Sequence, residues 1–362
     1  MVDDSAAPKA NAATTIGVSG LATGGGDLST NRTITVPKSS SAQALAGTDD
    51  TTAMTPARVA QAMTTRGTLY GSDFGMNGGA GSTFDNTPAF NALIAAAKAG
   101  NQRMFIDKGV YYFKSKPSNI DFPADLSGLN KNATVMIRDY NEASSSTGFL
   151  HLIPNCNGST IRNMAIEANV GTTGGCLIAA VSSTTVAIGG LSFENLVLSS
   201  LGSATHFCSL YLNGSAKMPN VPPGTPQGIR STNIYNVDIF GSTSYSLQAI
   251  SAEGLTWNGG GMYPAGALQA TYPQSGGLLI SGITGNLSQY ININVSTTGG
   301  LNLTNCKDLN LTIPNVGDVS GVSIGTDTTC STCLVSGKLY GTFAGSWTDS
   351  GIIRPGTGFA TS

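Results

Sequence analysis

The acidic residues of segment 145–345 are the first candidates for chemistry. Hydrolysis of a glycosidic bond needs two carboxyl groups, about 5–5.5 Å apart for retention of configuration and roughly 6.5–9.5 Å apart for inversion. The carboxylates of this segment are few, namely Glu167, Glu194, Asp238, Glu253, Asp308, Asp318 and Asp327. Glu194, Asp238 and Glu253 fall at neighbouring outward positions of a repeated strand motif. They are therefore the catalytic candidates if the protein is a hydrolase.

A group of aromatic and polar residues in segment 235–272 could instead bind a carbohydrate. Carbohydrate recognition uses exposed aromatic faces together with hydrogen bonds from small polar side chains. The glycan-binding candidates are Tyr235, Asp238, Trp257, Asn258 and Tyr263. The alternative is that the rings belong to the core, and Trp257 in particular falls at an inward position of its motif.

Other reaction chemistries find little support in the sequence. The two histidines, His151 and His206, are isolated, and no Asp pair occurs beyond residue 50. These absences disfavour a pectinase, a calcium-dependent lyase and a Ser-His-Asp hydrolase. The six cysteines fit neither a disulfide framework nor a zinc ribbon, so buried, reduced thiols are expected. We expect no metal and no cofactor.

The composition excludes several partners. Only 10% of the 362 residues are charged, the net charge is −2, and Lys and Arg form no cluster. This removes the electrostatic footprint that a nucleic acid or an acidic membrane surface would need. No run of about 18 apolar residues could insert into a membrane. The 47 glycines and the low charge instead favour short strands and turns over surface helices.

Two repeated elements indicate the architecture. The first reads apolar, any residue, Asn, apolar, any residue, apolar, and the copies are 161–166, 193–198 and 234–239, with Gly254 or Asp308 in the Asn position of 252–257 and 306–311. The second is a glycine turn followed by a short strand, at 276–280, 299–303 and 321–324. Short strands recurring every 22 residues or so, without helices, predict an all-β fold, a parallel β-helix. Each repeat Asn is expected at a bend, bonded to the backbone of the next coil.

Alignment of the repeats places the acidic residues relative to one another. Glu194 and Glu253 share one outward position, which Tyr235 occupies in another coil, and Asp238 lies in the next outward position. With coils about 4.8 Å apart, Glu194 would lie one coil from Asp238 and two coils, about 9.6 Å, from Glu253. That separation is compatible with a hydrolase. The alternative is a solvated ladder with Arg162 and ordinary surface ion pairs.

The residues before the repeats predict different elements. Thr87 is placed to cap a helix that begins at Pro88 and ends at Gly100, and two short strands follow within 104–113. Earlier, residues 33–36 predict a hairpin or single strand, and 54–63 predict a short helix. The pieces of 1–67 are too small to form a core alone. They would be stable against a partner or against copies of themselves.

The same segments resemble those of a known family, the tail spikes and tail fibres of tailed bacteriophages. GGGDLSTNRTITVP (24–37) and AGTDDTTAMTPARVAQAM (46–63) are similar to segments near the virion-proximal ends of tail fibres. SDFGMNGGAGSTFDNTPAFNALIAAA (72–97) with MFIDKGVYYF (104–113) resembles the segment that leads into a pectate-lyase-like β-helix. The usual acidic GDG-x-x-DDT turn is replaced by GGAGSTFDNT, which keeps Asp85 and Thr87.

The resemblance implies a right-handed parallel β-helix and a homotrimer. It implies a virion-attachment region (1–67), a strand-helix-strand capping segment (68–144), the β-helix (145–345) and a C-terminal tail (346–362). The chain would be made in the bacterial cytoplasm, join the virion through a tail or baseplate protein, and bind a bacterial surface polysaccharide, either lipopolysaccharide or capsule. Two alternatives are a polysaccharide depolymerase of the glycoside hydrolase type and a structural tail component that carries another receptor-binding chain.

Overall fold

A computed structural model describes residues 13–46, 49–59, 67–183, 186–202, 204–214, 228–241, 245–263, 277–281, 288–297, 301–304, 306–316, 324–326, 331–339 and 353–355. The chain divides into two compact units, Met1–Thr68 and Leu69–Ser362. The second unit contains the repeats and all of the candidate site residues.

The first unit contains little regular structure among its described residues. Strands β1 (Thr15–Ile16) and β2 (Gly26–Asp27) pair antiparallel, helix α1 spans Ser41–Ala46, and residues 56–59 are helical. The predicted strand at 33–36 is reduced to one bridge between Thr35 and Thr23. Ile34 and Val36 are exposed, so no core lies behind them to extend the strand. Of the helix predicted over 54–63, residues 56–59 are helical, and residues 60–63 lie outside the described residues.

The second unit begins with the capping segment. Strand β3 (Thr68–Tyr70) is followed by the short helix η1 (Gly71–Phe74), helix α3 (Thr87–Gly100) and strands β4 (Arg103–Ile106) and β5 (Gly109–Phe113). Phe90, Leu93, Ile94 and Ala97 on one face of α3 are buried, as their spacing predicts. The assignment of Thr87 as the cap is wrong. Thr87 is the first helical residue, and its hydroxyl donates instead to the Ser115 carbonyl.

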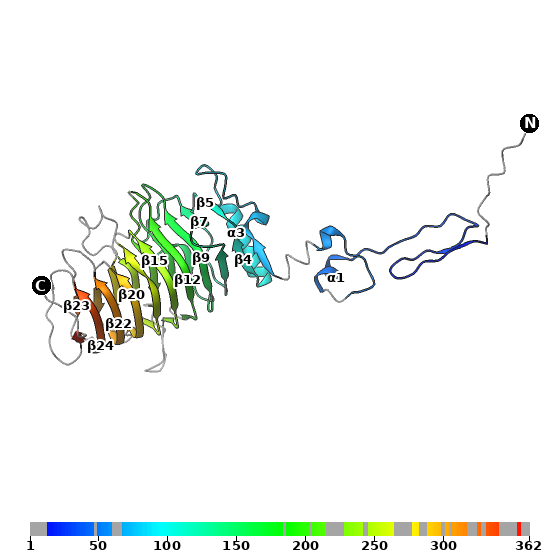
Figure 1. The fold of residues 1–362 in the computed structure, drawn as a ribbon. Coiled ribbons are helices and arrows are strands. Elements are labelled where there is room, and N and C mark those ends of the chain that lie inside the picture. Colours follow the sequence, from blue (N-terminus) through cyan, green and yellow to red (C-terminus); the bar gives the residue numbers. More distant parts are fainter. Residues whose placement is uncertain are drawn as a thin grey trace, which may run out of the picture. The chain divides into compact units, whose positions relative to one another are not determined.

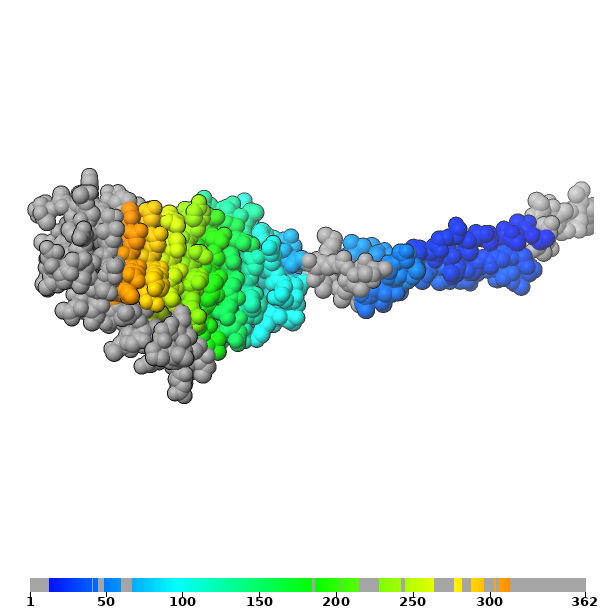
Figure 2. Space-filling model, turned by 90° about the horizontal axis from the view of Figure 1, so that it is seen from below, coloured from blue at the N-terminus to red at the C-terminus, as the bar shows by residue number. Residues whose placement is uncertain are grey.

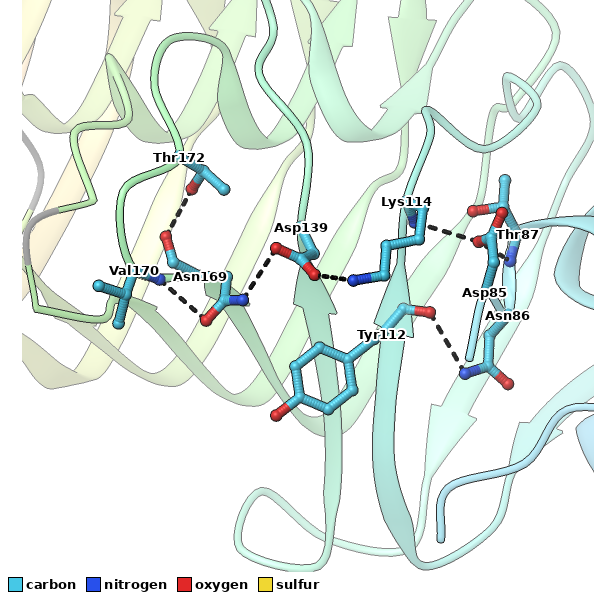
Figure 3. A network of polar contacts seen from close by, with 9 residues as sticks. All are labelled: Asp85, Asn86, Thr87, Tyr112, Lys114, Asp139, Asn169, Val170 and Thr172. Carbon is cyan, nitrogen blue, oxygen red and sulfur yellow. Dashed lines mark hydrogen bonds and ion pairs between the residues drawn. The ribbon is translucent and has the colours of Figure 1, made fainter. Parts of the chain in front are cut away.

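Polar side chains tie the start of α3 to the first coils (Figure 3). The Asp85 carboxylate accepts from the backbone N–H groups of Thr87 and Lys114, at 2.9 and 3.1 Å. The Lys114 ammonium forms an ion pair with Asp139, whose carboxylate also accepts from the Asn169 amide at 2.8 Å. The retained Asp of the capping segment therefore organises the helix start and links it to successive strands.

The repeats form a parallel β-helix (Figure 1). Among the described residues one sheet has seven strands, which in spatial order are β23 (Ile324–Thr326), β21 (Leu301–Thr304), β19 (Gly277–Ser281), β16 (Tyr245–Ile250), β13 (Cys208–Asn213), β10 (Cys176–Val181) and β8 (Gly148–Leu152). Parallel register pairs Leu278 with Leu301 and Leu301 with Ile324. The glycine-turn repeats therefore stack coil on coil.

A larger sheet continues around the coils. Its main path among the described strands is β11 (Ile188–Gly189), β14 (Ile229–Arg230), β17 (Ala252–Glu253), β20 (Ser288–Thr297), β18 (Thr256–Tyr263), β15 (Asn233–Phe240), β12 (Ser192–Ser200), β9 (Thr160–Ala168), β6 (Asp125–Gly128), β4 and β3. Strands β5, β7 (Thr134–Arg138), β22 (Cys306–Val316), β24 (Ser331–Leu339) and β25 (Ile353–Pro355) attach beside it. In Figure 2 the coils appear as successive bands in chain order.

The apolar residues of the repeats fill the inside of the β-helix. One continuous cluster runs from Phe90 in the cap through Phe113 and Phe149, whose rings pack edge to face, to Leu311. Cys156, Cys176, Cys208 and Cys306 are buried, as expected, and no disulfide joins them to one another. Cys330 and Cys333 form a C-x-x-C motif in the sequence. Cys333 lies on β24, and Cys330 lies outside the described residues.

Candidate functional site

Two left-handed bends shape the outer surface of the larger sheet. One bend contains Gly158, Gly190, Ser231 and Gly254, and the other, five residues later in each coil, contains Asn163, Asn195, Asn236 and Gly259; all eight have positive φ. Asn and Gly tolerate this conformation better than other residues do. We call the second group the asparagine corner. The prediction that the repeat Asn residues lie at bends is confirmed.

The amides of the asparagine corner bond to one another. Asn236 donates to the Oδ1 of Asn195 at 2.9 Å, and Asn195 donates to the Oδ1 of Asn163 at 3.2 Å. The expected partner was the backbone of the next coil, so this detail of the prediction is wrong. An Asn side chain presents both a donor and an acceptor, and identical residues one coil apart can therefore satisfy each other.

The alignment of Glu253 with Glu194 is also wrong. Glu253 pairs with Arg230 in one neighbouring coil and with Gln289 in the other, and it precedes Gly254 of the first bend. Glu194 precedes Asn195 of the asparagine corner. Both bends follow an apolar residue and an outward residue, so the same local pattern occurs twice in one coil. The two carboxylates therefore occupy different rows of the surface.

The row of Glu194 contains several of the predicted residues. Register places Glu194 between Arg162 and Tyr235, and Tyr235 beside Asn258. Tyr235 is 59% exposed, and the Glu194 carboxylate accepts from the Ser192 hydroxyl at 2.6 Å. We use the name outer strip for Arg162, Glu194, Tyr235 and Asn258, together with Asp238, Phe240 and Tyr263 beyond the asparagine corner.

Two charged side chains of the outer strip, Arg162 and Asp238, form ion pairs. Arg162 lies 2.8 Å from the Asp125 carboxylate, which also contacts Arg103 at 2.9 Å. Asp238 forms a 2.7 Å ion pair with Lys131. Lys131 belongs to the segment between β6 and β7. In that coil, this segment takes the place that the single residue Asn163 has in the next coil. Because β9 and β12 separate these strands from β15, the Lys131 side chain was not predictable from local sequence.

Two rings beyond the asparagine corner stack on each other. The centroids of Phe240 and Tyr263 are 4.9 Å apart with an interplanar angle of 18°. Phe240 is 40% exposed, so the stack presents an aromatic surface to solvent. Phe240 was not among the predicted residues, although the alternation of strand β15 places it outward with Tyr235 and Asp238.

Trp257 does not belong to this surface. Its side chain is fully buried, and its indole N–H donates to the Gly259 carbonyl at 3.0 Å. The prediction that Trp257 contacts a glycan is therefore wrong, because the residue alternates with Asn258 and points into the core. Asn258 itself is exposed, as the prediction requires.

Glu167, on strand β9 near this surface, has a shifted pKa. Burial raises its pKa, although a hydrogen bond from Ser199 opposes the shift. Glu167 pairs in register with Ser199, which in turn pairs with Phe240. It therefore lies in the row of the aromatic stack, two coils away from Phe240.

The histidines lie elsewhere. His206 is fully buried between Ser200 and Ser209, and burial together with the charge of Arg138 lowers its pKa to about 3. His206 therefore has two serine partners, which its isolation in the sequence did not indicate. His151 lies on strand β8, 3.3 Å from the Lys116 ammonium, and burial lowers its pKa to about 4.

The described residues contain no group of three His, Cys, Asp or Glu side chains that could hold a metal ion. No helix within the same ranges is long and apolar enough to cross a membrane.

Comparisons with known proteins concern the fold. No protein-family model and no curated protein matches the chain. ORF18 of Geobacillus virus E2 is similar over 90% of this chain and 64% of its own, at 12% identity and a TM-score of 0.39. An iota-carrageenase complexed to iota-carrageenan fragments is similar over 72% of this chain and 56% of its own, at 14% identity and a TM-score of 0.34.

A tailspike is also among the similar structures. The Dettilon tailspike protein is similar over 79% of this chain and 69% of its own, at 8% identity and a TM-score of 0.27. This chain spans less than two thirds of the length of the Geobacillus virus protein and of the carrageenase. The stacked parallel strands make this chain a parallel β-helix protein.

Proposed function

We propose that this chain is a tail spike or short tail fibre of a tailed bacteriophage. It acts as a homotrimeric receptor-binding protein that attaches the virion to a bacterial surface glycan. The resemblance of segments 24–37, 46–63 and 72–113 to phage tail proteins supports this proposal, as does the β-helix that follows them. The N-terminal unit would join a tail or baseplate protein after synthesis in the host cytoplasm.

The exposed rings of the outer strip support a glycan as the ligand. The apolar C–H face of a sugar ring can pack on Tyr235 and on the stacked Phe240 and Tyr263. Hydroxyl groups of the same sugar can bond to Asn258 and Glu194, which flank Tyr235 in register. The exposure of Tyr235 among polar neighbours is the observation that carries the proposal.

The arrangement of carboxylates favours binding over cleavage. Glu194 and Asp238 lie on adjacent strands but on opposite sides of the asparagine corner. Asp238 is engaged by Lys131, and Glu253 belongs to another row. A depolymerase that uses Glu194 with Asp238 would first have to release Asp238 from its ion pair.

The test measures retention of the full chain on cells of candidate host strains and release of oligosaccharide from their envelope polysaccharide. Saturable retention without release is expected. Tyr235→Ala should bind about tenfold more weakly, a loss of ~1.4 kcal/mol from removal of one aromatic contact. Tyr290→Asn is the matched control, because Tyr290 is 56% exposed outside the outer strip and Asn tolerates its positive φ.

Three outcomes contradict the proposal in different ways. Equal binding by Tyr235→Ala and the parent chain would show that the outer strip is not the glycan-binding site. Oligosaccharide release that disappears in Glu194→Gln or Glu253→Gln would establish the depolymerase. Neither retention nor release, on a host that the phage infects, would indicate a structural tail component.

A further inference from the structure

Two cysteines face each other on neighbouring coils. Strands β10 and β13 pair in parallel with Cys176 directly opposite Cys208. Neighbouring strands are about 4.8 Å apart. That separation lies inside the range of roughly 4.4–6.8 Å over which Cα atoms of a disulfide are found. The backbone therefore already holds the two residues at a distance that a disulfide can bridge.

The surroundings of the thiols are separate from the main core. Cys176 and Cys208 form a small buried cluster with Ala179 and Tyr211, apart from the continuous cluster that fills the β-helix. Formation of a bond between them would therefore leave the packing of the main core in place.

The hydrogen bonds of the thiols can be lost at little cost. Cys176 donates to the Ser145 carbonyl and Cys208 to the Leu210 carbonyl, each at 3.1 Å. A thiol is a weak donor. Oxidation removes both S–H groups, and the two carbonyls lose only weak partners.

We propose that Cys176 and Cys208 are a modification site, at which an intercoil disulfide forms in an oxidising thiol buffer. With glutathione disulfide as the oxidant, one cysteine thiolate attacks a glutathione sulfur, and one glutathione leaves as its thiolate. The second cysteine thiolate then attacks the protein sulfur of the mixed disulfide and releases the second glutathione. The two cysteines lose two electrons and two protons, and one glutathione disulfide becomes two molecules of glutathione.

The bond would enclose segment 176–208, which contains β11 and all of β12, including Glu194. Burial and the neighbouring Cys176 thiol raise the pKa of Cys208 well above its ordinary value, so its thiolate is scarce. Both residues are fully buried. Exchange therefore follows local opening of the segment around Ser145, and it is expected to be slow in the folded protein.

The experiment uses the full chain, either folded in a glutathione redox buffer or incubated with glutathione disulfide after folding. Thiols are then alkylated in denaturant, and the protein is examined by intact mass and by peptide mapping. We expect loss of two alkylation sites and a cross-link between the peptides that contain Cys176 and Cys208. The oxidised protein should also melt at a higher temperature than the reduced protein, because the closed loop restricts the unfolded chain.

Two variants keep the result interpretable. The double variant Cys330→Ser, Cys333→Ser removes the C-x-x-C pair and should still lose two alkylation sites. In the Cys208→Ser variant, Cys176 should remain available for alkylation. The melting temperature of this variant should be the same in both buffers, and circular dichroism verifies that it folds. Six alkylated cysteines, a stable mixed disulfide with glutathione, or a cross-link between any other pair would overturn the proposal.

Discussion

His206 is a fully buried imidazole that faces the hydroxyls of Ser200 and Ser209. Its pKa of about 3 lies below the value of about 6.5 in an unfolded chain. Between these values the unfolded state binds more protons than the folded state. The stability that His206 contributes is therefore complete above pH 6.5 and is lost as the pH falls toward 3.

This titration predicts a shallower loss of stability in acid for His206→Gln. Denaturant unfolding between pH 7 and pH 4 measures the slope for the variant and for the parent chain. His151→Gln serves as a comparison, because the pKa of His151 is lowered less, to about 4. If His206→Gln and the parent chain lose stability equally with falling pH, His206 does not titrate as its burial indicates.

Single residues also show how far the sequence alone could predict the site. The outward positions of Tyr235, Asp238 and Asn258 follow from strand alternation, and so does the inward position of Trp257. The surface row to which Glu253 belongs could not be predicted from the sequence, because the two bends of a coil have the same local sequence pattern. Lys131 could not be found either, because its partner Asp238 is 107 residues away and is reached only through the stacking of coils.

At the scale of elements, the asparagine corner ends at a glycine. Asn163, Asn195 and Asn236 are followed in the next coil by Gly259, whose φ is 75°. An ideal Cβ at Gly259 would come no closer than 3.8 Å to Asn236, whereas at Gly260 it would lie 2.1 Å from the Val237 carbonyl oxygen. There is room for a side chain at the first position and none at the second.

We therefore predict that Gly259→Asn is tolerated and extends the row of amide hydrogen bonds. The melting temperature should stay the same or rise, since each added bond is worth about 1 kcal/mol. Gly259→Ala should lower the free energy of unfolding by about 1–2 kcal/mol, because alanine adds no hydrogen bond and a positive φ is unfavourable for it. Gly260→Ala should be destabilised more than either. A lower stability for Gly259→Asn than for Gly259→Ala would contradict this account of the corner.

Element types were easier to predict than element limits. The periodicity of α3 and the Asn repeats identify one helix and the stacked strands, because burial of one face imposes a regular pattern. Helix α1 carries no comparable pattern, and the strand at 33–36 lacks a core to hold it. Helix α3 begins at Thr87, one residue before the predicted start at Pro88. The Thr87 N–H is accepted by the carboxylate of Asp85, two residues before it in the chain.

At the scale of the whole molecule, the two units differ in their internal packing. The second unit has a continuous core that begins at Leu69. In the first unit, Ile16, Ile34 and Val36 are exposed. The first unit is therefore the part that we expect to depend on a partner or on copies of itself.

This difference predicts that removal of residues 1–68 leaves the β-helix folded. The shortened chain should keep the far-ultraviolet circular dichroism of parallel strands and a cooperative melt, and by our proposal it should still bind the glycan. Sedimentation equilibrium of both chains measures whether the first unit contributes to the proposed trimer. Loss of strand structure on truncation would show that the second unit does not fold independently.

The ion pair between Lys131 and Asp238 has a consequence for how the molecule unfolds. In a solenoid most contacts join adjacent coils, so a terminal coil can fray without disturbing those further along. Lys131 contacts β15 across two intervening strands. If the coil that contains Lys131 frays, the ion pair with Asp238 on a coil that is not its neighbour must break. Amide hydrogen exchange along β7, β9, β12 and β15 is therefore expected to be coupled, with these strands opening together as one cooperative block.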